Sequence, residues 1–168
     1  MSERQHPWRR FFARSIDISV ISSLILIPYV QLSERLYSPY FQSILRTLIV
    51  MLILFIAETI LLSLMGTTLG KWILNIKVIA IHDSSICFTN ALKRSFFVYM
   101  RGQAFGLPII SLFTELDSYY ELRDNGSTSW DDKADTKVLY DRVGIIRVII
   151  AMLLIISPGL ISIMVYVL

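Results

Sequence analysis

Residues 8–17 read Trp-Arg-Arg-Phe-Phe-Ala-Arg-Ser-Ile-Asp and lead directly into a long apolar run. On a helix, Arg10, Arg14 and Asp17 lie three or four residues apart and share one face. A carboxylate at the mouth of a membrane helix costs about 1–3 kcal/mol unless a cation or water satisfies it. We expect Arg10 and Arg14 to be that cation. Two interpretations stay open: an ion pair at a helix end with no further role, and part of a functional polar site.

The composition is typical of an integral membrane protein. Hydrophobic residues make up 55% of the 168 residues and charged residues 17%, against about 45–50% and about 25% in soluble domains. The apolar residues come in blocks close to the roughly 20 residues of helix that cross a bilayer. We therefore predict an all-α membrane bundle of three to four spans. The net charge of +3 is modest and the basic residues flank apolar runs, which excludes a nucleic-acid footprint.

Three apolar runs predict membrane helices. Residues 1–15 form a basic N-terminus that the positive-inside rule places in the cytoplasm, with the bacterial inner membrane as the expected location. The first run, 16–31, has no cleavage site after it, so we expect an uncleaved span. Its serines (Ser19, Ser22 and Ser23) give a small polar surface suited to helix packing. The second span covers 44–65, and the run 145–168 predicts an additional C-terminal transmembrane helix.

Glu58 interrupts the second span about two turns from its inner end. A lone carboxylate within lipid is paired, functional or exposed to water. We keep all three interpretations open at this point.

The third apolar region, 95–116, is broken near its middle by Gly106 and Pro108. Either it spans fully and places 117–147 outside, or it forms a re-entrant helical pair and leaves 117–147 inside. Irregular backbone at membrane depth is tolerated only where protein or water surrounds it. The five basic residues within 117–147 favour the inside, re-entrant arrangement.

A polar connection follows the second span. Residues 66–71 read Gly-Thr-Thr-Leu-Gly-Lys, but the spacing and the following Trp72 do not fit a phosphate-binding loop, so we exclude nucleotide binding. Residues 76–81 and 86–89 predict a small cytoplasmic β-hairpin or extended flap. Asn90 is a candidate N-cap of the next helix.

Catalytic and metal-binding patterns are missing from the sequence. The only histidines are His6 and His82, the only cysteine is Cys87, and no nucleophile–histidine–acid set is recognisable. We predict that the protein is not an enzyme and binds neither a cofactor nor a metal. The expected partners are the lipid bilayer, a second copy or another membrane protein, and a monovalent cation or proton.

Four motifs, in the same order and at workable spacing, resemble the RDD family, which is named for one arginine and two aspartates. They are residues 10–17 (Arg-x-x-Ala-x-x-x-Asp), residues 66–71 (Gly-x-Thr-x-Gly-Lys) followed by Ile76-Lys77-Val78, the basic segment 91–94, and residues 131–138 (Asp-x-x-Ala-x-Thr-x-Val). The resemblance covers about residues 8–139, as a membrane domain that excludes 145–168. Glycine is usual in the family at Asn75 and Asp135, and arginine is common at Asp132.

The resemblance implies a small multi-pass membrane protein. Transport is generally suspected in the family, with sodium–proton exchange suggested for some members, and a eukaryotic relative is described as a scaffold in a membrane quality-control complex. In a transporter, Asp17, Glu58 and Asp131 would exchange a proton for a cation. In a scaffold the same charges would form a clasp, with Arg10 and Arg14 pairing with Asp17 and Asp131. The predicted polar cluster is Arg10, Arg14, Asp17, Glu58, Lys71 and Asp131, and the predicted structural turns are Gly66, Gly70, Gly106 and Pro108.

Overall fold

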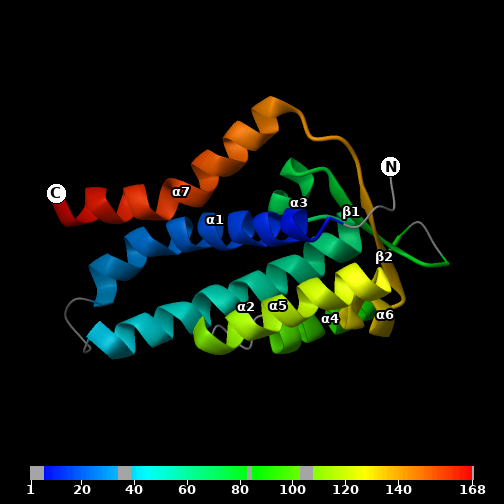
Figure 1. Ribbon diagram of the computed structural model, residues 1–168. Coiled ribbons are helices and arrows are strands. Elements are labelled where there is room, and N and C mark those ends of the chain that lie inside the picture. The colour runs from blue at the N-terminus through cyan, green and yellow to red at the C-terminus, as the bar shows by residue number, and fades with distance from the viewer. Residues whose placement is uncertain (1–5, 34–38, 83–84, 103–107, 168) are drawn as a thin grey trace.

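The computed structural model describes residues 6–33, 39–82, 85–102 and 108–167. These ranges contain seven α-helices, one π-helical turn and two short strands (Figure 1). The α-helices are α1 (Pro7–Ser33), α2 (Pro39–Met65), α3 (Leu69–Ile73), α4 (Phe88–Phe97), α5 (Pro108–Asn125), α6 (Ser129–Lys133) and α7 (Ile145–Val167). The π-helical turn is η1 (Val98–Gly102), and the strands are β1 (Ile76–Ala80) and β2 (Thr136–Tyr140).

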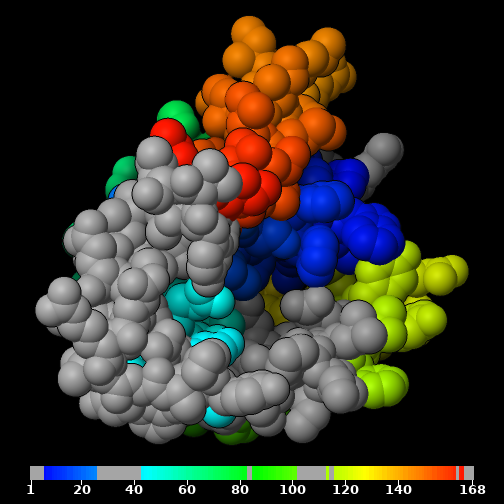
Figure 2. Space-filling model, turned by 90° about the vertical axis from the view of Figure 1, so that its left-hand side faces the viewer, coloured from blue at the N-terminus to red at the C-terminus, as the bar shows by residue number. Residues whose placement is uncertain are grey.

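The long helices lie side by side, and the short elements gather at one end of the molecule (Figure 1). Helices α1 and α2 run antiparallel, and α7 lies along the opposite side of α1 (Figures 1 and 2). The serine surface of α1 meets α7, where the Ser23 and Ser157 hydroxyl oxygens are 3.1 Å apart. Small hydroxyl side chains allow such close helix packing.

Helix α2 carries the clearest membrane signal. Within the described residues, its segment Ser43–Met65 is the one helix long and apolar enough to cross a membrane, and Ile145–Ile161 is a shorter apolar helix. Helix α2 also exposes an apolar stripe at helical spacing, formed by Leu48, Leu52, Ile56 and Ile60. This supports association with a membrane.

The third apolar region contains two described helical segments, one on each side of residues 103–107. Helix α4 and turn η1 end at Gly102, and α5 begins at the predicted breaker Pro108, while Gly106 lies outside the described residues. Helix α5 returns toward the sheet, and the next helix, α6, packs against α4 (Figure 1). Helix α6 and strand β2 therefore lie at the same end of the molecule as Arg10.

The predicted hairpin between 76–81 and 86–89 is wrong. Strand β1 pairs instead with β2, antiparallel, with Val78 opposite Val138. Both valines are buried, because they belong to the core cluster in which the sheet packs against residues of the helices. Residues 86–89 form no strand, and α4 begins at Phe88, ahead of the predicted cap Asn90.

The two strands belong to a structural repeat that was not predicted. Residues 66–80 and residues 126–140, here called the first and second repeats, adopt the same sequence of conformations 60 positions apart. Each has a glycine of positive φ, an N-cap threonine, a five-residue helix, a second residue of positive φ and a strand. The equivalent pairs are Gly66 and Gly126 (φ 69° and 75°), Thr68 and Thr128, and Asn75 and Asp135 (φ 50° and 49°).

A local two-fold axis relates these repeats. Equivalent residues Val78 and Val138 pair with each other, and the remaining pairs of the ladder exchange under the same operation. The bonds at the strand ends are reciprocal as well. The Ile81 amide donates to the Asp135 carbonyl at 2.9 Å, and the Asp141 amide donates to the Asn75 carbonyl at 3.1 Å.

The core lies where the sheet meets the long helices. The buried set is Ala13, Ile16, Leu62, Ile73, Leu74, Ile76, Val78, Ile86, Ala91, Val138, Tyr140 and Ala151. Helix α3 packs directly on α1, since a Cβ atom built on Gly70 would lie 2.0 Å from the Ala13 carbonyl oxygen. Only glycine permits that approach, which fixes α1 against the first repeat.

Candidate functional site

Three buried carboxylates lie at the sheet end of the molecule. Asp17 on α1, Glu58 on α2 and Asp131 on α6 have exposed fractions of 7%, 3% and 2%. Buried carboxylates are costly unless cations or hydrogen-bond donors surround them. Each of the three meets such partners, and the partners differ.

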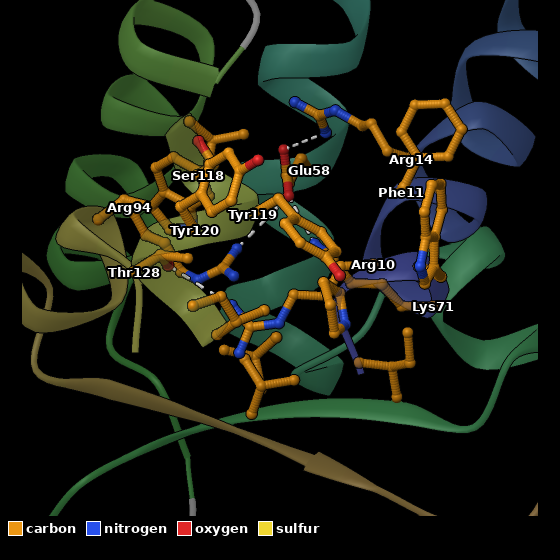
Figure 3. Close-up of a pocket in the computed structure, with 18 of the residues that line it drawn as sticks. Arg10, Phe11, Arg14, Glu58, Lys71, Arg94, Ser118, Tyr119, Tyr120 and Thr128 are labelled. Atoms are coloured by element: carbon orange, nitrogen blue, oxygen red, sulfur yellow. Dashed lines mark hydrogen bonds and ion pairs between the residues drawn. The ribbon is translucent and has the colours of Figure 1, made fainter. Parts of the chain in front are cut away.

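Glu58 binds three cations that come from three other helices. Its Oε2 atom is 2.5 Å from Arg14 Nη1 of α1, and its Oε1 atom is 2.5 Å from Lys71 Nζ of α3 and 3.6 Å from Arg94 Nη1 of α4 (Figure 3). Burial lowers the pKa of Lys71, and Glu58 offsets only part of that effect. Among the interpretations left open for Glu58, the structure therefore places it in a paired state.

Asp131 binds two arginines and a hydroxyl. Arg10 Nη1 is 2.5 Å from its Oδ2 atom, Arg94 Nε donates to Oδ1 at 2.9 Å, and Thr128 Oγ1 donates to Oδ2 at 2.8 Å. Burial alone would raise the pKa of Asp131, but Arg10 and Arg94 outweigh it and hold the pKa below its usual value. Arg94 touches both Glu58 and Asp131, so it joins the two ion-pair groups into one cluster.

Asp17 departs from the prediction. The ion pairs of Arg10 and Arg14 go to Asp131 and Glu58, whereas Asp17 accepts hydrogen bonds from Thr68 Oγ1 at 2.6 Å and from the Gly70 amide at 2.7 Å. The first turn of a helix offers unpaired amides, and α3 lies close enough to α1 to supply one. Arg10, Arg14 and Asp17 lie on one helix as predicted. The two arginines, however, form their ion pairs with carboxylates of other helices and not with Asp17, because their side chains are long enough to reach them.

Arg94 was missed as a member of the site, although the segment 91–94 had been noted. Ala91, Arg94 and Ser95 are all buried, and their spacing of three and four residues puts them on one face of α4. An arginine on the same helical face as an alanine and a serine is the signal that would have marked it. Thr68 and Thr128, the two N-cap residues, were also absent from the predicted cluster. Their role becomes visible only when the two repeats are compared.

The predicted turn residues fall into three groups. Gly66 ends α2 with a φ of 69°, which favours glycine, and Gly70 lies against α1 as described above. Pro108 begins α5, where a proline is tolerated. Gly106 lies outside the described residues.

A cavity of about 410 Å³ opens between α1 and α5 beside this cluster. Arg10, Arg14 and Lys71 lie on one side of it and Arg94 on the other, with Glu58 between them (Figure 3). The wall nearer the surface is aromatic and apolar: Trp8, Phe11, Leu116, Tyr119 and Tyr120. Within the described residues, no three His, Cys, Asp or Glu side chains are placed to hold a metal ion.

Comparison with known protein families agrees with the resemblance that the four motifs indicate. A family model described as the RDD family matches residues 4–167, which extends past the predicted limits of 8–139 and includes α7. No curated protein and no solved structure matches the chain. Because the family match covers nearly the whole sequence, the chain belongs to the RDD family.

Proposed function

We propose that this protein is a non-enzymatic, multi-pass membrane protein of the bacterial inner membrane that serves as a scaffold or accessory subunit. One observation carries the proposal. The three carboxylates that are buried among the described residues are held by groups of the same chain, and their partners come from α1, α4 and the two repeats. Breaking a buried ion pair leaves an uncompensated charge, so such a cluster fixes the arrangement of the helices.

The same contacts argue against cation exchange at Glu58. A transported cation needs carboxylate oxygens as ligands, and both oxygens of Glu58 are 2.5 Å from a nitrogen of Arg14 or Lys71. A cation would therefore have to displace two internal charges before it could bind. Asp17 is likewise engaged by Thr68 and the Gly70 amide.

The decisive measurement is ion flux in proteoliposomes that contain the purified full chain. We expect no sodium- or potassium-dependent proton movement above that of empty vesicles, and no difference between wild type and Glu58→Gln. Asp117→Asn, an exposed change on α5, is the matched control. Flux that is present in wild type and in the control but lost in a folded Glu58→Gln protein would overturn the scaffold proposal.

Transport is the second candidate, and the cavity between α1 and α5 favours it. A space of about 410 Å³ that reaches Glu58 and Lys71 could admit a solute to the charge cluster. In that case flux should depend on pH and should also disappear in Asp17→Asn protein that still folds. Three or four spans in one chain are too few to surround a transport pathway, so transport would require a homo-oligomer. Chemical cross-linking in membranes should then detect that oligomer.

A scaffold makes a different prediction about assembly, because its complex contains a second membrane protein and not only further copies of this chain. Mild solubilisation should release the wild-type chain in a discrete complex larger than the single chain. Asp131→Asn should shift the protein to smaller species, whereas Asp132→Asn, which changes an exposed neighbour of the same charge, should leave the complex unchanged. A monodisperse single chain in wild-type membranes would contradict this role.

A further inference from the structure

We propose that the cavity between α1 and α5 binds the phosphate headgroup of an anionic phospholipid, whose acyl chains leave past the aromatic wall. This goes beyond the proposed function, because the ion-pair cluster holds the helices together without any ligand. The proposal rests on three features of the cavity. They are the excess of positive charge on its inner side, here called the floor and formed by Arg10, Arg14, Glu58, Lys71 and Arg94, the apolar wall between the floor and the surface, and the depth at which the charges lie.

The floor has more positive than negative charge. The cations Arg10, Arg14, Lys71 and Arg94 face Glu58, and Asp131 lies just behind them. Asp17 also lies near Lys71 and Arg14, so four cations meet three carboxylates and one positive charge is left over. An additional anion would balance this excess charge. Phosphate suits this floor best, since arginine matches its oxygens with two parallel hydrogen bonds.

The upper wall indicates that the anion carries an apolar body. Trp8, Phe11, Leu116 and Tyr120 line the cavity and expose 63%, 43%, 48% and 56% of their surface. A site for free phosphate would gain nothing from such a wall. A lipid gains from it twice, because acyl chains lie against apolar side chains and aromatic rings favour the headgroup level.

The depth of the floor strengthens the case. Glu58 lies seven residues before the end of α2, which corresponds to about 10 Å along the helix. Charges at that depth are costly wherever lipid tails touch them, and this cavity opens between α1 and α5. A headgroup seated on the floor would keep acyl chains away from the cations. Basic pockets between membrane helices are known headgroup sites in general.

Native mass spectrometry of the full chain in detergent tests the proposal with defined lipids. Phosphatidylglycerol and phosphatidylcholine of the same acyl chains are added in turn, and inorganic phosphate is added as a competitor. We expect phosphatidylglycerol to be retained at least about tenfold more than phosphatidylcholine, as one charge-assisted contact gives. Inorganic phosphate at equal concentration should displace little of it.

Two pairs of variants locate the site. Lys71→Gln removes one cation of the floor and should lower phosphatidylglycerol retention about tenfold. Lys77→Gln, an exposed lysine on β1, should change nothing. Leu116→Trp fills the mouth of the cavity without altering its charges and should also lower retention. Phe113→Trp, on the same helix and exposed, is its control.

Each outcome decides the question. Equal retention of the two lipids overturns the proposal, and so does a preference for phosphatidylglycerol that persists in both Lys71→Gln and Leu116→Trp. Full displacement by inorganic phosphate would replace the lipid with a free anion and also overturn it. If Lys71→Gln fails to fold, Leu116→Trp still tests the site, because this second variant keeps every ion pair of the cluster. A failure here leaves the flux and assembly tests of the scaffold role unaffected.

Discussion

The first and second repeats share one backbone design but carry opposite charge. At the third position of the short helix, the first repeat has Lys71 and the second has Asp131. Lys71 turns to the carboxylate of α2, and Asp131 turns to the arginines of α1 and α4. The comparison teaches that a duplicated scaffold can position complementary charges, and that the conformational signature is conserved between the repeats where the chemistry is not.

The largest effect is expected where the second repeat loses its charge. Asp131→Asn leaves Arg10 and Arg94 buried with one fewer carboxylate, so we expect the free energy of unfolding to fall by about 3–5 kcal/mol. Asp132→Asn, exposed and adjacent, should change it by less than about 0.5 kcal/mol. Denaturation of the purified chain in detergent measures both. Equal effects in the two variants would mean that Asp131 is not held by its ion pairs.

The same carboxylate should make the protein sensitive to acid. Because the folded state lowers the pKa of Asp131, its stabilising contribution is complete above the ordinary aspartate pKa of about 3.9 and is lost as the pH falls below that value. Stability measured from pH 6 downward should therefore decline below about pH 4. Asp131→Asn should show a shallower decline, and an unchanged acid limb in that variant would contradict the assignment.

A steric difference between the repeats ranks third. Position 70 is glycine because α1 lies against it, whereas the equivalent position in the second repeat holds Trp130. Gly70→Ala should cost about 3 kcal/mol through overpacking against the Ala13 carbonyl. Gly144→Ala, at a glycine with open space around it, is the control. Thermal unfolding of the two variants decides; a similar midpoint for both would show that α1 can move away from α3.

The two threonine caps can be separated by double-mutant cycles. Thr68 binds Asp17 on α1, while Thr128 binds Asp131 within its own repeat. We expect Asp17→Asn and Thr68→Val to show a coupling energy of about 1.5 kcal/mol, typical of a hydrogen bond to a charged group. The cycle of Asp17→Asn with Thr128→Val should give a coupling near zero. Coupling of similar size in both cycles would point to a global effect.

The smallest effect concerns the two residues of positive φ that are not glycine, Asn75 and Asp135. Asp135→Gly should raise stability by about 1 kcal/mol, since glycine adopts this conformation without steric cost. Asn75→Gly should gain less, because Asn75 also donates from its side chain to the Arg142 carbonyl and accepts from Arg147. Chemical denaturation resolves the difference. A larger gain at Asn75 than at Asp135 would reverse this ranking.

Much of the architecture was predictable from local patterns. The apolar runs located α1, α2 and α7, and Pro108 of the Gly–Pro break marks the start of α5. The departure of Asn75 and Asp135 from the family glycine also had a structural meaning, since both have positive φ. These features depend on residues close together in the sequence, which a pattern can register.

Long-range pairing was not predictable in the same way. Strand β1 could join any apolar strand, and proximity favoured residues 86–89, while the real partner lies 60 residues away. The partners of Asp17 were missed because the close approach of α3 to α1 depends on Gly70. Arg94 was overlooked because its two carboxylates come from helices distant in sequence. The predicted clasp did include the pair of Arg10 and Asp131, and the recurrence of Gly-x-Thr at residues 66–68 and 126–128 was a further signal of this arrangement.

The pairing of equivalent strands across the two-fold axis also has a consequence for biosynthesis. Strand β1 is made 60 residues before β2, which at about 5–20 residues per second is a delay of roughly 3–12 s. During that interval the edge of β1 has no strand partner, and Arg10 has been made without Asp131. Completion of the second repeat closes the edge and neutralises the arginine together. A nascent chain that stops between the repeats therefore displays an unmatched charge together with an open strand edge, which is a template for pairing with another chain.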